Sequence, residues 1–408
     1  MVLIIGAGPA GLMAAIAAAE KGAQVTLLEP NEKLCMKLRI TGKGRCNVTN
    51  TANLDELIVN VPVNGRFLYS AFSRFGSTDT IDFFENLGVP MKAERGGRVF
   101  PCSGNAHDIA DALVRKAKQA GVHIIQGRAS RLQVSGGRIQ GVATEDGGEL
   151  HADAVVIATG GCSYPKTGST GDGYALAEQA GHTIISPKPS LVPLECHENF
   201  CAALMGLGLK NTAMEVWDGS SCRMIYKDIG ELLFTHFGVS GPMALSASSH
   251  MRSMAPGHYE IRLDLKPALR PEQLDARILR DFAAAPNKNF INALNGLLPK
   301  SLVPVIVRLS GVPAGLPVNQ VTREQRQALI EILKCVRLTV KGFRPIEEAI
   351  ITSGGVCVNE IKPATMQSKL LPGLFFAGEV IDCDAYTGGF NLQIAWSTGY
   401  VAGVSAIH

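Results

Sequence analysis

A glycine-rich turn near the amino terminus is the first part of the chain whose residue types could do chemistry. Gly6, Gly8 and Gly11 form the pattern GxGxxG between an apolar strand expected at Val2–Ile5 and a helix of small residues. The first glycine permits a tight turn, the second lets the backbone approach a pyrophosphate, and the third allows the helix to pack closely on the strand. The helix start offers N–H groups and a favourable dipole to phosphates, so the turn predicts a dinucleotide site.

An acidic residue follows at the spacing that such a site requires. Glu29 ends the second expected strand, eighteen residues after Gly11, where its carboxylate can accept hydrogen bonds from ribose hydroxyls. The same charge would repel a 2′-phosphate, which favours FAD or NAD over NADP. FAD is long and needs contacts from remote segments, and Ala158–Gly161 and Gly378–Asp382 are suited to supply them.

A cluster of basic side chains lies shortly after Glu29. Five cations fall within thirteen residues: Lys33, Lys37, Arg39, Lys43 and Arg45. Ammonium and guanidinium groups form strong charge-assisted hydrogen bonds with phosphate oxygens, so some of them could neutralise the FAD pyrophosphate or a nicotinamide phosphate. The alternative is a solvated basic loop.

A second glycine-rich segment, Gly388–Asn391, stands before the last expected helix. Its backbone N–H groups could approach the N1 and O2 edge of a flavin and stabilise the negative charge of the reduced ring. A plain helix-capping turn is the alternative.

Four side chains are weighed for catalysis. His236 lies in a glycine- and serine-rich turn and could act as an acid or donate a hydrogen bond to a substrate carbonyl. Tyr386 and Asp384 precede the second glycine-rich segment and could protonate the carbon opposite a hydride. For all three, a structural role is the alternative. Cys46 adjoins Arg45 but has no CxxC partner, so a disulfide shuttle is not expected.

The chain has no second GxGxxG motif. Residues Gly168–Gly173 read GSTGDG, but they follow proline and lysine rather than a clean strand. A dedicated NAD(P)H domain is therefore not expected. A nicotinamide donor would have to dock transiently at the flavin and leave before the substrate enters, which predicts ping-pong kinetics.

The expected elements describe a discontinuous domain with an insertion. A βαβ start is expected from a helix at Pro9–Lys21 and a strand at Gln24–Leu28. Further elements are expected at Ala129–Val134, Arg138–Thr144, Ala154–Ala158, Tyr259–Leu265, Pro271–Ala284, Arg323–Leu333 and, as a final helix, Gln393–Val404. We predict a first part of the cofactor domain at 1–186, an insertion at 187–344 and a second part at 345–408.

Composition excludes several classes of protein. The 408 residues are 46% apolar, which predicts a multidomain globular protein, and the longest apolar run, Ala10–Ala19, is shorter than the roughly 18 residues of a membrane span. Ten scattered cysteines without a CxxC pair indicate reduced thiols and no metal site. We expect a cytoplasmic protein with no membrane partner. A net charge of +3 neither argues for RNA nor excludes it.

One segment resembles a known family. Ile40–Asn50 is similar to the TGxGRCNxTN signature of a bacterial flavoprotein family that includes aminoacetone oxidase, a bile-acid enone reductase and a ribosomal RNA dihydrouridine synthase. Gly97–Pro101, Phe234–Pro242 and Tyr386–Asn391 also match, and the resemblance runs from Ile4 to Gly403. The stretch around Cys35 and Met36 departs from the family pattern.

This resemblance implies an α/β fold: a Rossmann-like FAD domain interrupted by a β-barrel and a small helical domain. His236 and Tyr386 are the catalytic candidates. With the remote segments, the resemblance makes these residues FAD candidates: Gly6, Gly8, Pro9, Ala10, Gly11, Glu29, Lys37, Thr41, Gly42, Gly44, Arg45, Asn47, Ala129, Thr159, Gly160, Gly161, Gly378, Glu379, Asp382, Gly389, Phe390, Asn391 and Leu392.

Four functions follow as alternatives. The leading one is a reductase that uses NAD(P)H and FAD to reduce a carbonyl-conjugated C=C bond of a small organic substrate, such as a bile-acid-like enone. The second is a dihydrouridine synthase acting on ribosomal RNA, which would require a basic face beside the flavin. The third is an oxidase of small amines of the aminoacetone type, and the fourth is a flavin-binding protein without turnover.

Overall fold

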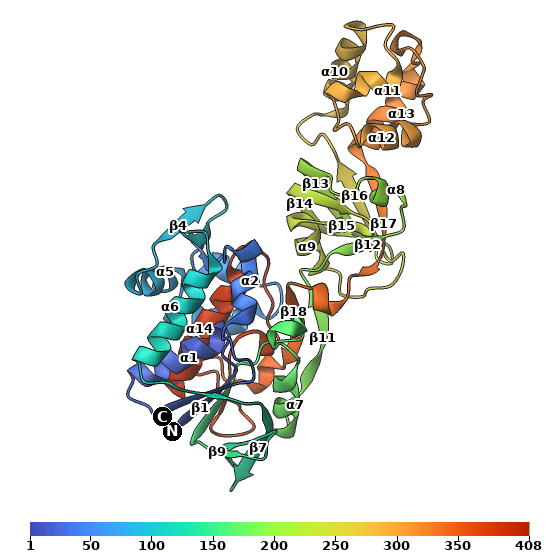
Figure 1. Ribbon diagram of the computed structural model, residues 1–408. Coiled ribbons are helices and arrows are strands. Elements are labelled where there is room, and N and C mark those ends of the chain that lie inside the picture. Colours follow the sequence, from blue (N-terminus) through green and yellow to red (C-terminus); the bar gives the residue numbers. More distant parts are fainter. Residues whose placement is uncertain (408) are drawn as a thin grey trace. The chain divides into compact units, whose positions relative to one another are not determined.

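The chain forms two compact units (Figure 1). The computed structural model describes residues 1–407; His408, the last residue of the predicted second cofactor segment, lies outside them. The first unit combines Met1–Ser190 with the chain from Pro345 on, and the second is Leu191–Arg344. The second unit starts four residues after the predicted 187, because strand β11 (Ile184–Ser190) pairs with β18 (Ile351–Val356) of the first unit. The predicted α/β class, a Rossmann-type domain with an inserted barrel, is confirmed.

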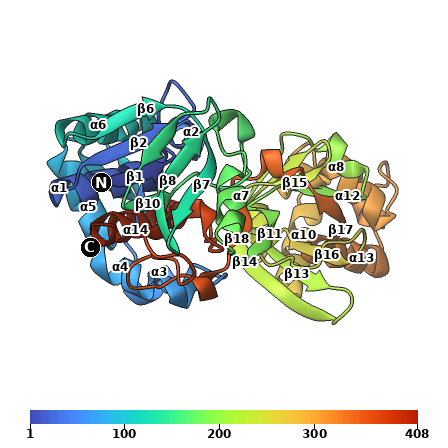
Figure 2. The ribbon, with the colours of Figure 1, turned by 90° about the horizontal axis from the view of Figure 1, so that it is seen from below.

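A five-stranded parallel sheet forms the centre of the first unit. Four of its strands are buried at every residue and mostly apolar, as expected of strands covered on both faces, whereas the edge strand β6 (His123–Gln126) has no buried residue. Since ligands of such sheets bind beyond the carboxyl ends of the strands, the glycine turn and both remote segments emerge at the functional edge. The order across the sheet is β19 (Leu374–Phe376), β10 (Ala154–Ile157), β1 (Val2–Ile5), β2 (Val25–Glu29) and β6, and the last four strands are labelled in Figure 2.

The helices that follow the two glycine segments pack directly on each other. Helix α1 (Pro9–Glu20) contacts α14 (Phe390–Ser405) along most of its length. A Cβ atom on Gly399 would collide with the carbonyl of Ala10, and one on Gly403 with the carbonyl of Ala14. Small residues therefore set this close approach. The expected start of the last helix at Gln393 was wrong: the helix begins three residues earlier, at Phe390, after the N-cap residue Gly389, which has φ of 98°.

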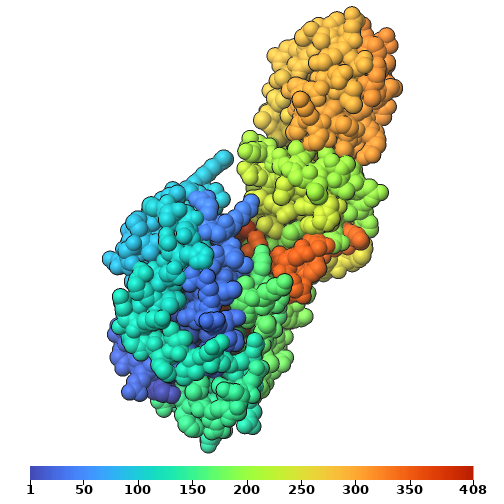
Figure 3. Space-filling model, viewed as in Figure 1, coloured from blue at the N-terminus to red at the C-terminus, as the bar shows by residue number. Residues whose placement is uncertain are grey.

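Smaller elements complete the first unit. An antiparallel sheet places β5 (Arg98–Pro101) between β3 (Thr49–Asn50) and β4 (Met91–Glu94), which brings Asn50 opposite Arg98. The tip of the β4–β5 hairpin stands out from the surface (Figure 3). The other elements are α2 (Met36–Gly44), α3 (Leu54–Val59), α4 (Tyr69–Arg74), α5 (Ser77–Asn86), α6 (Ala106–Gln119), α7 (Asp172–Gln179), β7 (Ala129–Ser135), β8 (Arg138–Thr144) and β9 (Glu149–His151).

The second unit contains a closed six-stranded barrel and a group of helices, with a hydrophobic core of its own. The barrel order is β12 (Leu194–Cys196), β15 (Gly238–Ser240), β14 (Arg223–Thr235), β13 (Gly208–Asp218), β16 (Tyr259–Asp264) and β17 (Val336–Phe343). Its helices are α8 (Phe200–Ala203), α9 (Pro242–Ser248), α10 (Pro271–Ala283), α11 (Phe290–Ala293), α12 (Val303–Ser310) and α13 (Arg323–Lys334). Every helix within residues 1–407 is too short or too polar to span a lipid bilayer.

Candidate functional site

The first glycine turn leaves open space at one position and none at the other two. A Cβ atom on Gly6, where φ is 100°, would lie 2.7 Å from Ala158 O, and one on Gly11 would collide with Gly6 O. A Cβ atom on Gly8 would meet no other atom within 4 Å. The backbone at Gly8 is therefore accessible, as a site for a pyrophosphate at the start of α1 requires.

Glu29 is held against this turn by backbone and amide groups. Its Oε2 accepts a hydrogen bond from Ala7 N at 2.7 Å, and its Oε1 accepts from the Asn31 backbone at 3.0 Å and from Asn31 Nδ2 at 2.6 Å. Gly127 N donates to Glu29 O, which places the start of β7 at Ala129 close by. The buried carboxylate is thus oriented, and carboxylate oxygens have further lone pairs for ribose hydroxyls.

Two FAD candidates from opposite ends of the chain bind each other. Lys37 Nζ donates to Glu379 Oε2 at 2.7 Å and to Ser163 Oγ at 2.6 Å. Glu379 Oε1 accepts from Thr352 N at 2.8 Å. The positive charge of Lys37 is therefore balanced by a carboxylate at the edge of the sheet, and any phosphate would meet a neutral pair rather than a bare cation.

The segment from Thr41 to Cys46 has an unusual backbone. Lys43 and Cys46 are non-glycine residues in the left-handed region, with φ of 58° and 57°. Such residues cost on the order of 1–3 kcal/mol each and cluster at functional sites. Cys46 N donates a hydrogen bond to Thr41 O, and Arg45 N donates one to Gly42 O. These two bonds close the turn, in which Gly44 also has a positive φ. The tightly turned segment fits a role in binding a ligand.

Most of the basic cluster is paired with acids from remote segments. Arg45 Nη2 donates to Glu94 Oε1 at 2.5 Å, and its guanidinium lies 4.2 Å from the centroid of the Phe100 ring. Arg39 Nη2 donates to Asp111 at 2.7 Å. Lys33 and Lys43 are exposed. The prediction did not identify these acids, because nothing in the local sequence marks them.

Cys46 is buried and chemically protected. Burial raises the pKa of its thiol to about 12. A thiol that stays protonated at neutral pH is a poor nucleophile. The side chain therefore packs as a small apolar group in the hydrophobic core of the first unit.

Two buried polar atoms near the FAD candidates have no hydrogen-bond partner among the described residues. They are Asn47 Oδ1, which follows the strained turn, and Thr159 Oγ1, which follows β10 just before Gly160 and Gly161. Buried polar atoms are rarely left unsatisfied without a ligand or water nearby. These atoms and the open backbone at Gly8 fit the binding of a long polar ligand such as FAD. Sequence reasoning missed a third such atom, Tyr174 OH in α7.

The second glycine segment is braced by its own side chains. Asn391 Oδ1 accepts from Ala385 N at 2.9 Å, and Asn391 Nδ2 donates to Ala385 O at 2.8 Å. Asp382 accepts from Asn64 Nδ2 at 2.9 Å. The amide of Asn391 thus shapes the loop, and the first N–H groups of α14, from Phe390 to Leu392, are the ones left without intrahelical acceptors.

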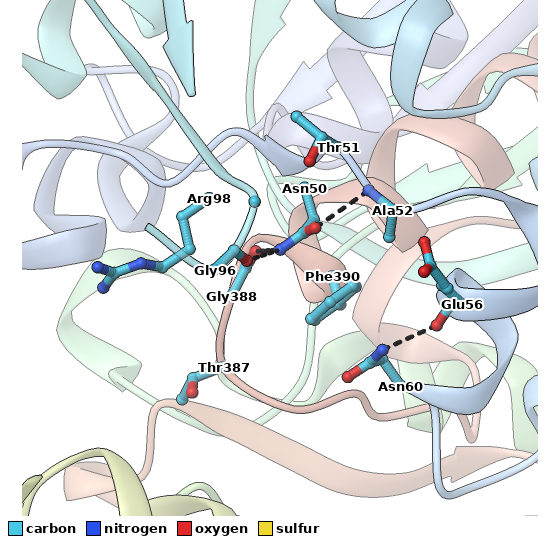
Figure 4. Close-up of a pocket in the computed structure, with 11 residues that line it drawn as sticks. Asn50, Thr51, Ala52, Glu56, Asn60, Gly96, Arg98, Thr387, Gly388 and Phe390 are labelled. Carbon is cyan, nitrogen blue, oxygen red and sulfur yellow. Dashed lines mark hydrogen bonds between the residues drawn. The ribbon is translucent and has the colours of Figure 1, made fainter. Parts of the chain in front are cut away.

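A cavity of about 520 Å³ lies beside this loop (Figure 4). Asn50 joins its walls, because Asn50 Nδ2 donates to both Gly96 O and Gly388 O at 3.0 Å. The size is in the ordinary range for small ligands. Eleven residues line it: Asn50, Thr51, Ala52, Glu56, Asn60, Gly96, Gly97, Arg98, Thr387, Gly388 and Phe390.

Sequence reasoning did not identify this cavity as a site. Its walls come from three distant segments, around Asn50, Arg98 and Gly388, that meet only through the β3–β5 pairing and the Asn50 amide. The one signal in the sequence was that Gly97–Pro101 and Tyr386–Asn391 both match the flavoprotein family that the chain resembles.

The two catalytic candidates lie in different units. His236 is exposed in the turn between β14 and β15 of the second unit, with its ring 5.0 Å from that of Phe237. Tyr386 is partly buried in the first unit, and its backbone N donates to Asn60 O at 3.0 Å. Neither lines the cavity described above. Both catalytic roles stay predictions.

Asp384, weighed with Tyr386 as a proton donor, is fully buried. Its Oδ2 accepts from Ser190 Oγ at 2.8 Å and its Oδ1 from Ser353 Oγ at 2.9 Å. This carboxylate therefore joins the β11–β18 ribbon to the glycine loop. In the described part of the chain, no group of three or more His, Cys, Asp or Glu side chains is arranged to hold a metal ion.

The chain is similar to known proteins along nearly its whole length. A family model described as "HI0933-like protein Rossmann domain" matches residues 1–405. A 3-dehydro-bile acid delta(4,6)-reductase of Clostridium scindens is 33% identical over 99% of this chain and 98% of its own length. A ribosomal RNA dihydrouridine synthase of Escherichia coli is 32% identical over 98% of this chain and 96% of its own length.

A solved structure shares the fold. It is the 3-ketosteroid-delta4-(5alpha)-dehydrogenase from Rhodococcus jostii RHA1, with a TM-score of 0.53 and 17% identity, covering all of this chain and 96% of the other. The glycine turn, the unpartnered polar atoms and the matching relatives point to one cofactor, FAD. The chain belongs to the HI0933-like Rossmann-domain family and is an FAD-dependent oxidoreductase.

Proposed function

We propose that this protein uses NAD(P)H to reduce a carbonyl-conjugated C=C bond of a small organic substrate, with a bile-acid-like enone as the leading type. The observation that carries the proposal is the cavity of about 520 Å³ beside Gly388, because it offers room for a small ligand next to the loop proposed to contact the flavin. The relative from Clostridium scindens, named as a bile-acid reductase, supports this substrate class.

The chain's own residues would bind and orient the reactants. FAD, when bound, supplies hydride-transfer chemistry. Gly8 and the start of α1 would receive its pyrophosphate, Glu29 its ribose, and the amino terminus of α14 its negatively charged ring edge. Asn50 fixes the cavity wall relative to the loop at Gly388. Tyr386, which adjoins the cavity residue Thr387, is the proposed source of the proton.

Anaerobic rapid mixing tests the proposal. NADH or NADPH should bleach the visible absorbance of the FAD-loaded protein, and a 3-oxo-Δ4 steroid acid should restore it. A saturated 3-oxo steroid acid is the matched control, because it lacks the C=C bond and should restore nothing. Failure of both nicotinamides to bleach the flavin would contradict the proposal. Peroxide release with an amino ketone would point instead to an amine oxidase.

Dihydrouridine synthesis in ribosomal RNA is the second candidate, and the charge of the second unit favours it. Leu191–Arg344 contains 18 Lys and Arg against 13 Asp and Glu, whereas the remainder of the chain contains 21 against 23. Positive charge attracts the phosphate backbone. Two relatives, 32% and 30% identical, are named ribosomal RNA dihydrouridine synthases. Restoration of flavin absorbance by a ribosomal RNA fragment, and not by the steroid acid, would establish this alternative.

A further inference from the structure

One cation, the exposed Arg98, is among the residues that line the cavity beside Gly388. We propose that the guanidinium of Arg98 binds the substrate's carbonyl oxygen and stabilises the negative charge that develops on it. The site would then select compounds in which a C=C bond is conjugated to such an oxygen. This inference rests on the proposed function and specifies how that site recognises its substrate.

Strand pairing fixes the backbone of Arg98, and one nitrogen of its exposed side chain forms a hydrogen bond. Arg98 begins β5, where it lies opposite Glu94 of β4 on one side and Asn50 of β3 on the other. Its Nε donates to Arg95 O at 3.1 Å. This bond restrains the guanidinium and leaves the two terminal nitrogens as donors for a ligand.

Within the part of the chain that the structure describes, Arg98 has no ion-pair partner, although the carboxylate of Glu94, which Arg45 and Lys92 bind, lies near enough for the charge of Arg98 to help lower its pKa. Across residues 1–407, no carboxylate oxygen lies within the 4.0 Å of an ion pair with its guanidinium, whereas Arg39 and Arg45 each have one. Arg98 is also the one cation among the residues that line the cavity. An arginine without an acidic partner is available to an oxygen that carries negative charge.

The rest of the lining is consistent with an oxygen bound at this end of the cavity. Figure 4 shows Arg98 and Thr387 on one side and Glu56 and Asn60 on the other, with the Arg98 side chain extending outward, away from Asn50 and Phe390. The carboxylate of Glu56 already accepts a hydrogen bond from Asn53 N at 2.8 Å, as the cap of α3. The cation and the hydroxyl group of Thr387 thus lie on one side of the cavity, and the acid lies on the other side.

The chemistry of the proposed reaction needs such a group. When a hydride adds to the carbon farther from the carbonyl, a new C–H bond forms and the electron pair of the C=C bond moves toward the carbonyl oxygen, which becomes enolate-like. A proton then binds the carbon next to the carbonyl. Donors aimed at the developing oxyanion lower the barrier of this type of step. The same oxygen chemistry occurs in an enone and in uracil, so Arg98 would serve either substrate.

A phenolate tests the role of Arg98 without turnover. The ionised form of 4-nitrophenol resembles an enolate oxygen on a ring and absorbs visible light, so its binding to the FAD-loaded protein can be followed directly. We expect the wild-type protein to lower the pKa of the bound phenol. Arg98→Met should weaken phenolate binding about tenfold or more, because one charge-assisted hydrogen bond is lost. Arg98→Lys should retain part of the effect.

Arg95→Met is the matched control. Arg95 is an exposed arginine in the same hairpin, but it does not line the cavity, so its loss changes net charge equally and should leave phenolate binding unchanged. FAD content and thermal unfolding of each variant show that the fold is retained. Equal loss in both variants, no loss in Arg98→Met, or no phenolate binding to the wild type would each overturn the proposal. Flavin bleaching by NAD(P)H is measured separately, so a failure of the proposed function would appear as unbleached flavin even if phenolate binding depends on Arg98.

Discussion

Lys37 and Glu379 are 342 positions apart and form an ion pair of 2.7 Å at the carboxyl edge of the parallel sheet. Lys37 precedes the strained turn at Thr41–Cys46, and Glu379 follows β19. Ser163, which follows β10, donates to Glu379 Oε1 at 3.1 Å and accepts from Lys37. One polar cluster therefore joins three of the segments proposed to contact FAD.

Removal of Lys37 should weaken both the fold and cofactor binding. Lys37→Met leaves the Glu379 carboxylate without its cation, and we expect a loss of about 1–3 kcal/mol in the free energy of unfolding, less than for a fully buried pair because water reaches both side chains. Urea unfolding of the apoprotein and FAD titration measure the two effects. Lys33→Met is the control, since Lys33 is an exposed cation of the same cluster. Equal unfolding free energies and equal FAD affinities in Lys37→Met and Lys33→Met would contradict the prediction.

Gly8 and Gly11 should respond differently to alanine. A Cβ atom on Gly11 collides with Gly6 O, whereas one on Gly8 meets no atom within 4 Å. Gly11→Ala should lose several kcal/mol of stability or fail to fold, since backbone atoms cannot move aside cheaply. Gly8→Ala should unfold at the wild-type temperature and yet bind FAD more weakly. Thermal unfolding followed by circular dichroism measures the stability of both variants, and FAD titration measures their affinity for the cofactor. A Gly8→Ala protein with unchanged FAD affinity would count against a pyrophosphate bound at Gly8.

Protonation of His182 should destabilise the first unit. Burial lowers the pKa of His182 below its ordinary value of 6.5, and its ring nitrogens contact Glu360 at 3.1 Å and Ser368 at 2.7 Å. The unfolded chain therefore binds this proton more readily than the folded one. The stabilisation is fully present above about pH 6.5 and is lost as the pH falls through the lower folded-state pKa, with a slope of at most about 1.4 kcal/mol per pH unit.

Urea unfolding at a series of pH values measures this slope. His182→Gln should flatten it, and His123→Gln, at an exposed position, should not. Burial also lowers the pKa of His250 in the second unit, so the difference between variants isolates His182. A slope that is the same in the wild type and His182→Gln would show that another group is responsible.

Thiol labelling should separate the cysteines by burial. Cys102 and Cys222 are exposed and should react first with iodoacetamide in the native protein. Cys46 should be protected, because burial keeps its thiol protonated. Peptide mass spectrometry before and after addition of urea provides the comparison. Labelling of native Cys46 at the rate of Cys102 would be incompatible with the buried position.

The sequence alone determined the features that depend on neighbouring residues. The apolar run at Val2–Ile5, the glycines at 6, 8 and 11, and Glu29 specify a βαβ start because turn geometry, helix packing and strand burial are local properties of those residues. The order of such segments was enough to predict a Rossmann-type domain with an insertion. The start of α14 was predicted three residues too late, because the N-cap position depends on the backbone angle φ of Gly389, which residue type alone does not give.

The tertiary structure decided which groups meet. The acids that bind Lys37, Arg39 and Arg45 come from remote segments, and charge pairing across such separations leaves no periodic signal in a sequence. The cavity at Gly388 is likewise a product of packing, since Asn50 joins it to the turn at Gly96 through one amide group. Local chemistry therefore indicated the cofactor, whereas the position of Arg98 at a ligand-sized space became visible only when three separate segments were folded together.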